Sequence, residues 1–293
     1  MIARLLLFVW ALLALAACQK APTPAAEPDA LPAIWEIAGA DGEAEGWLFG
    51  TVHALPDDVP WRSAELEQLL AQADTLVVEV AGLDDGEALG RTFTALAFDT
   101  PGPALADRVE PALRPRFEEL LAEARMRRGQ FDAMESWAAA LSLAQVAQVG
   151  SVENGVDKAL LRDFAGCDVV ELEGAQAQLA IFDRLPENAQ RELLNSVIEE
   201  SGDAESQARR LVESWRSGDL AGLEELTNGG MLEDGELYEA LLVRRNRAWA
   251  DRLEHLLSAP ARPLVAVGAG HMVGPDGLPA LLEARGFTVR RVQ

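Results

Sequence analysis

Short apolar runs lie near both ends of the chain, and longer stretches with helical periodicity lie between them. Apolar runs of this length predict β-strands. The turn Gly39-Ala40-Asp41-Gly42 joins the first two runs and is typical of a hairpin. The expected strands are at 34–38, 46–50, 75–80, 168–172, 264–267 and 287–292.

Residues 174–257 read as one helix after another, interrupted at Pro186, Gly202, Gly218 and Gly229-Gly230. Shorter helices are expected at 61–73, 111–128, 134–149, 155–164 and 277–284. Strands separated by helices predict an α/β fold with a central mixed β-sheet, flanked by helices and carrying the hairpin at one side. The large helical insert at 174–257 could form a cap or lobe over the sheet. No clean linker divides residues 33–293, so we predict one domain.

Residues 1–17 have the pattern of a secretory signal peptide. A basic start precedes an apolar run of about eleven residues, whereas a membrane-spanning helix needs roughly 20. The run ends in Leu-Ala-Ala-Cys at 15–18, which resembles the lipobox read by lipoprotein signal peptidase. The resemblance implies cleavage before Cys18 and acylation of that residue, for example with palmitate. A signal peptide with a chance cysteine is the alternative.

The segment 18–32 is rich in Pro and Ala and predicts a semi-extended tether between a lipid anchor and the domain. Lipid on Cys18 would hold the protein at a membrane without a spanning helix. Gln19 follows the cysteine. In a Gram-negative host this resembles the default sorting to the outer membrane, with the domain facing the periplasm.

The composition of the chain excludes some classes of partner and cofactor. It has 48 acidic residues against 25 basic ones and a net charge of -23, a balance that repels polyanions and argues against nucleic-acid binding. Only two cysteines occur, so no cysteine cluster can hold zinc or an iron–sulfur centre.

Two of the three histidines occupy the same local setting. His53 and His271 each follow an apolar strand through a Gly-x-x-His sequence, whereas His255 lies on an expected helix. Ligands in α/β proteins bind beyond the carboxyl ends of strands, where such loops carry side chains from a rigid base. A shared site and separate structural hydrogen bonds remain equal alternatives on spacing alone.

Carboxylates follow two other strands. Glu79 interrupts an apolar strand, where a charge is costly unless it is paired or ligates a metal. Glu173 ends a second strand, and Asp157 stands at the start of a helix. Structural roles are common at both of these places, so Glu173 and Asp157 stay open between function and structure.

The glycines around His271 also invite a dinucleotide-binding interpretation. Gly268-x-Gly270 superficially resembles a phosphate-binding turn. About twenty residues follow it, and none is an acidic residue at the distance that the ribose-binding position requires. We therefore reject that interpretation.

Taken in order, six motifs resemble the TraB/PrgY/GumN family, which includes the Tiki proteases. They are Leu-Phe-Gly-Thr-Val-His at 48–53, Val-Val-Glu at 77–79, Gly-Val-Asp at 155–157, Leu-Glu-Gly at 172–174 with Gln178, Arg-Arg-Asn at 244–246, and Ala-Val-Gly-Ala-Gly-His-Met-Val-Gly at 266–274. The similarity covers nearly all of residues 34–292. The chain departs from the family at Gly174, where a threonine is usual.

The resemblance implies a metalloprotease-like fold related to the erythromycin esterase and ChaN group. It implies an active centre of His53, His271 and Glu79, with His53 and His271 as metal ligands and Glu79 as third ligand or general base. Two histidines and a carboxylate suit Mn, Co, Zn or Fe without choosing among them. Arg244 is expected to stabilise an oxyanion. Asn246 is expected to orient groups or contact substrate, and Asp157 and Glu173 are expected to contact substrate.

These expectations favour a metal-dependent hydrolase acting on peptide bonds of a peptide or protein substrate. No serine, cysteine or threonine stands in a recognisable nucleophile motif, which favours an activated water. The alternative is a non-catalytic envelope lipoprotein that binds a partner, a polysaccharide component or a tetrapyrrole, as some relatives in the family do. A purely structural lipoprotein is the third hypothesis.

Overall fold

The computed structural model describes residues 31–98 and 102–293. Residues 1–30, with the predicted signal peptide, Cys18 and most of the tether, lie outside the described residues. The described part is an α/β fold built on one six-stranded sheet of order β4-β3-β5-β2-β1-β6. The strands are β1 (Ile34–Ala38), β2 (Ala44–Thr51), β3 (Thr75–Val78), β4 (Asp168–Glu171), β5 (Pro263–Gly268) and β6 (Thr288–Arg291).

The sheet is mixed, as predicted. Strands β4, β3, β5 and β2 run parallel, and β1 pairs antiparallel with both β2 and β6. The hairpin between β1 and β2 therefore continues one side of the parallel part. The last strand of the chain, β6, pairs with β1 and forms the edge of the sheet on that side.

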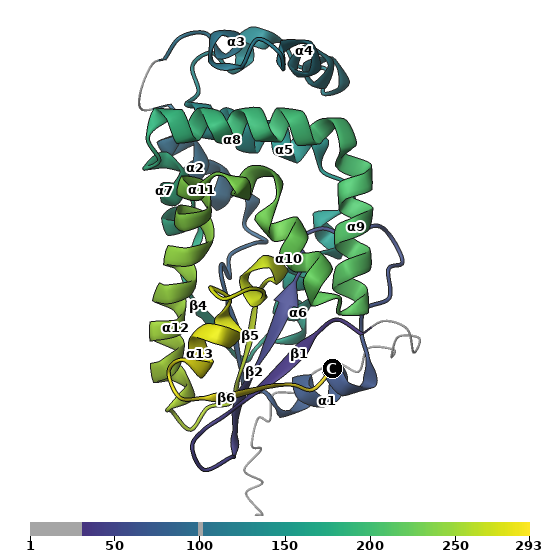
Figure 1. Ribbon diagram of the computed structural model, residues 1–293, viewed down its shortest axis with the longest axis vertical. Coiled ribbons are helices and arrows are strands. Elements are labelled where there is room, and N and C mark those ends of the chain that lie inside the picture. The colour runs from purple at the N-terminus through teal and green to yellow at the C-terminus, as the bar shows by residue number, and fades with distance from the viewer. Residues whose placement is uncertain (1–30, 99–101) are drawn as a thin grey trace, which may run out of the picture.

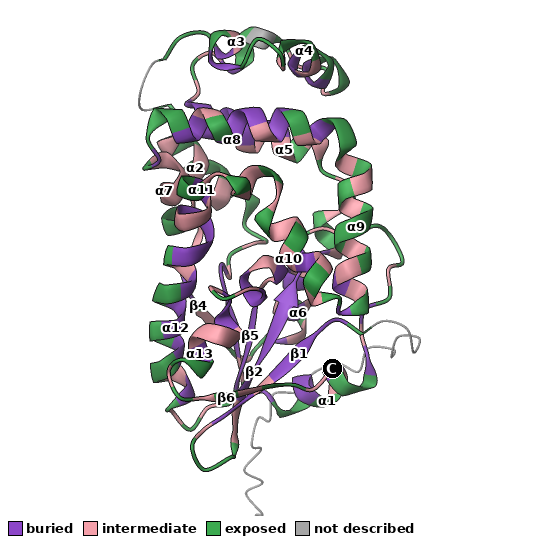
Figure 2. Cartoon of the chain, in the orientation of Figure 1, coloured by how far each residue is buried: buried purple, intermediate pink, exposed green. Residues whose placement is uncertain are grey.

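Alternation along the central strands builds a core on each face of the sheet. In β2, Trp47 and Phe49 join one core while Leu48 joins the other. The first core is completed by α1 (Ala64–Gln72) and α6 (Val156–Asp163). The second is completed by α12 (Arg244–Leu257) and α13 (Leu278–Glu283). Figure 2 shows the central strands as the buried middle of this layered part.

A third core belongs to a helical lobe above the sheet. In Figure 1, α8 crosses the top of the open region, α9 and α12 stand at its two sides, and α10 lies between them over the sheet. The lobe consists of α2 (Gly86–Leu96), α3 (Leu105–Arg108), α4 (Arg114–Glu123), α5 (Ser136–Ala147), α7 (Ala175–Asp183), α8 (Glu187–Glu200), α9 (Ala204–Ser217), α10 (Leu220–Asn228) and α11 (Gly235–Tyr238).

Short helical turns connect these elements. They are the 3₁₀ turns η1 (Arg128–Gln130), η2 (Val152–Asn154), η3 (Ser201–Asp203), η4 (Gly230–Glu233) and η6 (Ala269–Met272), and the π turn η5 (Glu239–Val243).

The predicted helical insert forms only part of this lobe. Its core also contains Phe117 from α4 and Trp137 from α5, which precede the predicted insert at 174–257. Helix α2 was not expected from the sequence. The helix expected at 111–128 is shorter in the structure, where α4 begins at Arg114 and ends at Glu123. No helix in residues 31–98 and 102–293 combines the length and apolarity needed to cross a membrane.

Candidate metal-binding site

The base of the site is the edge of the sheet where β3, β5 and β2 end. These strands are neighbours and run parallel, with Val78 opposite Ala266 and Thr51 opposite Gly268. Because the chain leaves all three strands at the same edge, the residues that follow them are brought together. This topology unites residues from near both ends of the chain.

The three predicted metal ligands converge on Gly268. A Cβ added to Gly268 would lie 3.3 Å from Glu79 Oε1, 3.7 Å from His53 Nε2 and 3.6 Å from His271 Cδ2. The glycine thus leaves a small space that all three side chains border. An added Cβ would press on Glu79 and stand in ordinary contact with the two imidazoles, filling the space between them.

His53 is oriented by Asp157. Its Nδ1 lies 2.8 Å from Asp157 Oδ2, and the Thr51 hydroxyl donates to Asp157 Oδ1 at 2.7 Å. A carboxylate behind Nδ1 fixes that nitrogen as the donor and leaves Nε2 facing the site. The imidazole exposes 67% of its surface, whereas Asp157 exposes 9%.

Helix α6 holds Asp157 in place through a close approach at Gly155. A Cβ on Gly155 would lie 2.3 Å from the carbonyl oxygen of His53, so only glycine allows the helix to start this near the histidine loop. The next residue, Val156, donates its N–H to Val52 at 3.0 Å. The motif Gly155-Val156-Asp157 therefore attaches α6 to the His53 loop.

The environment of His53 favours its protonated form when no metal is bound. Partial desolvation by the surrounding cavity lowers the pKa of this largely exposed ring, but the charge and hydrogen bond of Asp157 outweigh this and raise the pKa to about 9. Glu79 contributes in the same direction.

His271 is held in the opposite state. Asn246 donates through Nδ2 to the carbonyl oxygens of Asp276 and His271, so its Oδ1 accepts from His271 Nδ1 at 2.6 Å. The lone pair on Nε2 accepts from Arg245 Nη1 at 3.2 Å. Burial, together with the charge of Arg245, lowers the pKa of His271 to about 3. His271 is therefore a neutral imidazole at pH 7.

Glu79 is the centre of the hydrogen-bond network. Its Oε1 accepts from Gly268 N at 2.8 Å, and its Oε2 accepts from Gln178 Nε2 at 3.1 Å and from Arg245 Nη2 at 2.5 Å. Burial alone would raise its pKa, but the facing histidines and Arg245 lower it to about 2. Since His271 is neutral, we attribute much of this to the guanidinium. Glu79 is ionised at pH 7.

Arg245 is a residue of the site that the sequence analysis did not single out. Its guanidinium also pairs with Glu173, with Nε 3.0 Å from Oε1, and lies 4.6 Å from the centre of the Trp249 ring. Trp249 Nε1 donates to Glu173 Oε1 at 3.1 Å. Arg245 and Trp249 are four residues apart on α12 and so share one face of it, a spacing that could have indicated Arg245.

The neighbouring Arg244, predicted to stabilise an oxyanion, lies outside the site. Its side chain is 65% exposed and pairs with Glu239. The physical reason is helical phase, since consecutive residues on a helix point about 100° apart. The arginine that borders the site is Arg245.

Asn246, Asp157 and Glu173 lie behind the site residues. Asn246 is completely buried and holds His271, Asp157 holds His53, and Glu173 holds Arg245. Each therefore orients a neighbouring side chain, and their contact with substrate stays a prediction. His255 is exposed on α12, as expected.

The donor set suits a divalent cation in type and orientation. His53 presents Nε2, a neutral His271 has its lone pair directed into the site, and each ring has an oxygen partner behind Nδ1. As the side chains stand, residues 31–98 and 102–293 contain no His, Cys, Asp or Glu group of three gathered for metal binding. Arg245 occupies the His271 lone pair, so a three-ligand site requires this guanidinium to withdraw onto Glu173.

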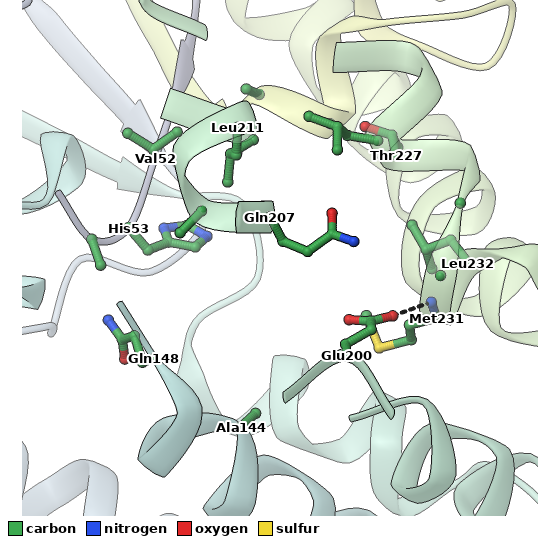
Figure 3. Close-up of a pocket in the computed structure, with 18 of the residues that line it drawn as sticks. Val52, His53, Ala144, Gln148, Glu200, Gln207, Leu211, Thr227, Met231 and Leu232 are labelled. Atoms are coloured by element: carbon green, nitrogen blue, oxygen red, sulfur yellow. Dashed lines mark hydrogen bonds between the residues drawn. The ribbon is translucent and has the colours of Figure 1, made fainter. Parts of the chain in front are cut away.

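The site opens into a cavity of about 1150 Å³ between the sheet and the helical lobe. Strand ends supply its base, and α5, α7, α8, α9, α10 and η4 supply its walls. Figure 3 shows His53 at its edge, together with apolar side chains such as Val52, Leu211 and Leu232. A cavity of this size accommodates a peptide segment or a drug-sized molecule.

Comparison with known proteins agrees with the motifs. The sequence model of the TraB/PrgY/gumN family matches residues 33–291. Two similar proteins are both named "Uncharacterized protein YbaP". The one from Shigella flexneri is 26% identical over 83% of this chain and 89% of its own length. The one from Escherichia coli strain K12 is 27% identical over 80% of this chain and 87% of its own length. No solved structure matches significantly.

Proposed function

Because the chain belongs to the TraB/PrgY/gumN family, we propose that it is a divalent-metal-dependent hydrolase of peptide bonds. The observation that carries the proposal is the convergence of His53, Glu79 and His271 on Gly268, at the base of a large cavity. Mn, Co, Zn and Fe all suit such a donor set. When bound, the cation would supply Lewis acidity, acidifying a water and polarising the scissile carbonyl.

The side chains around the cation would have different roles in the reaction. Glu79 has a pKa of about 2, which suits a permanently ionised ligand better than a general base near neutral pH. Asp157 and Asn246 hold the two imidazoles with Nε2 toward the site. Once Arg245 leaves His271, its Nη1 is free to donate to the oxygen that gains charge in the transition state.

Metal loading and cleavage test this proposal together. The full-length chain in detergent is stripped of metal, reloaded separately with Mn, Co, Zn and Fe, and incubated with a mixed peptide library read by mass spectrometry. The variants His53→Ala, His271→Ala and Glu79→Ala are compared with His255→Ala, whose histidine is exposed on α12. We expect one bound metal and cleavage in the wild type and His255→Ala. We expect at least about 100-fold slower cleavage in the other three, with folding checked by circular dichroism.

Two outcomes contradict the proposal. If all three site variants keep their metal, the ligand set is wrong. If metal binds but no peptide is cleaved, the result favours a non-catalytic envelope module, which would use the cavity to bind a partner, a polysaccharide component or a tetrapyrrole.

We also propose that Cys18 carries a lipid that anchors the protein in the cell envelope. The lipobox-like sequence and the Pro/Ala-rich tether support this. Metabolic labelling with palmitate should mark the wild type and fail to mark Cys18→Ser, which should leave the membrane fraction. Equal labelling of both would contradict the anchor.

A further inference from the structure

The cavity wall away from the histidines carries an unpaired carboxylate. Glu200 is the last residue of α8, and Figure 3 shows it directed into the open space that His53 also borders. Its Oε1 accepts from Met231 N at 2.7 Å. Within the described residues, no cation is paired with Glu200.

The position of Glu200 is unfavourable for a negative charge. The C-terminal end of a helix carries the negative end of its dipole, and Glu199 adds a second charge beside it. Desolvation first, and then Glu199, raise the pKa of Glu200, although the N–H of Met231 opposes them. A carboxylate retained in such a place calls for a compensating partner.

The chain is built to present this carboxylate. Gly230 adopts a φ of +58°, and a Cβ there would lie 2.3 Å from Glu200 Oε1. The positive φ favours glycine at this position, and without a Cβ the turn η4 can bring the Met231 N–H to one oxygen of Glu200 while that side chain stays in place. With Oε1 fixed in this way, Oε2 is left for the cavity.

The other charged side chains that line the cavity also favour a positively charged ligand. Among the described residues, its lining has four carboxylates, from Glu79, Glu200, Glu225 and Glu233, against two guanidinium groups, from Arg210 and Arg245, and the protonated ring of His53, which is paired with Asp157. Arg210 is paired with Glu225, and Arg245 with Glu79 and Glu173. No lining guanidinium is therefore left for an anionic ligand, and the cavity favours a cation.

We propose that Glu200 binds an ammonium or guanidinium group of a peptide held in the cavity. Such a group comes from a lysine or arginine side chain or from a free N-terminus. The inference rests on the proposed function only in taking the ligand to be a peptide. The favoured substrate is then a basic peptide. Its cationic group would bind Glu200 at the end of α8, and its backbone would extend to the strand ends that carry His53, Glu79 and His271.

Peptide binding, separated from turnover, tests the inference. The metal-free full-length chain is titrated by isothermal calorimetry with three otherwise identical pentapeptides, all with capped ends. One has a central lysine, one acetyl-lysine and one glutamate. A fourth arm has acetyl-lysine and a free N-terminus, which distinguishes the two sources of the ammonium group.

Glu200→Gln is the informative variant because its amide oxygen can still accept from Met231. Glu199→Gln is the matched control, since it removes the same charge from the adjacent exposed residue. We expect Glu200→Gln to weaken binding of a cationic peptide about 10-fold or more and to leave the acetyl-lysine peptide with capped ends unchanged. We expect Glu199→Gln to change neither.

The outcomes separate this inference from the proposed function. Equal loss of cationic-peptide binding in both variants, or no binding by the wild type, overturns the role of Glu200. If the metal and cleavage tests fail while cationic-peptide binding still depends on Glu200, the cavity is a binding site for basic peptides and the hydrolase proposal alone falls.

Discussion

Both imidazoles of the site are oriented through Nδ1, but by partners of different charge. Asp157 holds His53, and the neutral amide of Asn246 holds His271. The anionic partner stabilises an imidazolium and the neutral partner does not. Asp157 raises the pKa of His53 to about 9, whereas burial and the charge of Arg245, unopposed by an anion behind Nδ1, lower the pKa of His271 to about 3.

Replacing Asp157 by Asn should loosen His53 and weaken metal binding. An outer carboxylate behind a ligating histidine is typically worth about 10–100-fold in metal affinity. We expect a loss in this range, together with a fall of the His53 pKa toward its ordinary value, measured by metal titration and by NMR of the ring. Unchanged affinity and unchanged pKa would show that Asp157 does not support this histidine.

The metal-free protein should lose stability on both sides of about pH 6.5. The folded-state pKa of His271 is depressed, so its contribution is present above 6.5 and lost as pH falls toward 3. Glu79 adds a loss below about 4.5. The folded-state pKa of His53 is raised, so its contribution is present below 6.5 and lost as pH rises toward 9.

Urea unfolding at several pH values checks these signs. On the acid side, the slope should reach up to about 1.4 kcal/mol per pH unit for one proton. On the alkaline side it should be smaller, because solvent screens the pairing of the largely exposed His53 ring with Asp157. In His271→Gln, the loss of stability on acidification should begin below about 4.5 instead of 6.5, while His255→Gln should behave as the wild type. An unchanged acid limb in His271→Gln would contradict a buried neutral ring.

Among the secondary-structure elements, the orientation of α12 determines which of its first two arginines lies in the site. A π turn, η5, leads directly into α12 and alters the helical phase that the sequence alone suggests. The buried positions Asn246, Trp249, Ala250 and Leu253 nevertheless mark the inner face of the helix. Arg245 lies beside that face and Arg244 does not.

The two arginines should therefore respond differently to the same change. Arg245→Gln leaves Glu79 and Glu173 without their cation in a largely buried place, and we expect a loss of about 3 kcal/mol in unfolding free energy. Arg244→Gln removes an exposed pair and should cost less than about 1 kcal/mol. Equal losses, measured by chemical denaturation, would contradict the placement of the two side chains.

The close approach between the start of α6 and the His53 loop can also be tested by substitution. Gly155→Ala should displace the helix from the His53 loop, because its Cβ would meet the His53 carbonyl, and should cost about 1–3 kcal/mol. Gly90→Ala, inside α2 with nothing within 4 Å of the added Cβ, should stabilise by about 0.5–1 kcal/mol. Thermal unfolding compares the two; a neutral Gly155→Ala would contradict the close approach.

At the scale of the whole molecule, much of the sheet could be read from the sequence. The strands are short apolar runs bounded by turns, and their carboxyl ends carry His53, Glu79 and Glu173. Local patterns could not give the strand order, in which β5, from near the C-terminus, lies between β3 and β2. That order brings His271 to the same edge of the sheet as His53 and Glu79.

The helical lobe was harder to predict. Its core combines Leu105 and Trp137 with Leu193 and Leu241, residues that lie far apart in sequence and on both sides of β4. Periodicity identifies a helix but not its partners, so the contribution of α2–α5 to the lobe was missed. Glu200 was missed for the same reason, because its position in the cavity depends on the packing of α8 against η4.

A crystal structure of the metal-loaded full-length chain, with anomalous diffraction at the metal edge, would show whether the two histidines and Glu79 bind one cation. We predict one anomalous peak bound by His53 Nε2, His271 Nε2 and Glu79, with Arg245 withdrawn onto Glu173. A peak elsewhere, or a loaded crystal in which Arg245 still occupies His271 Nε2 and no peak lies between the rings, would contradict the account.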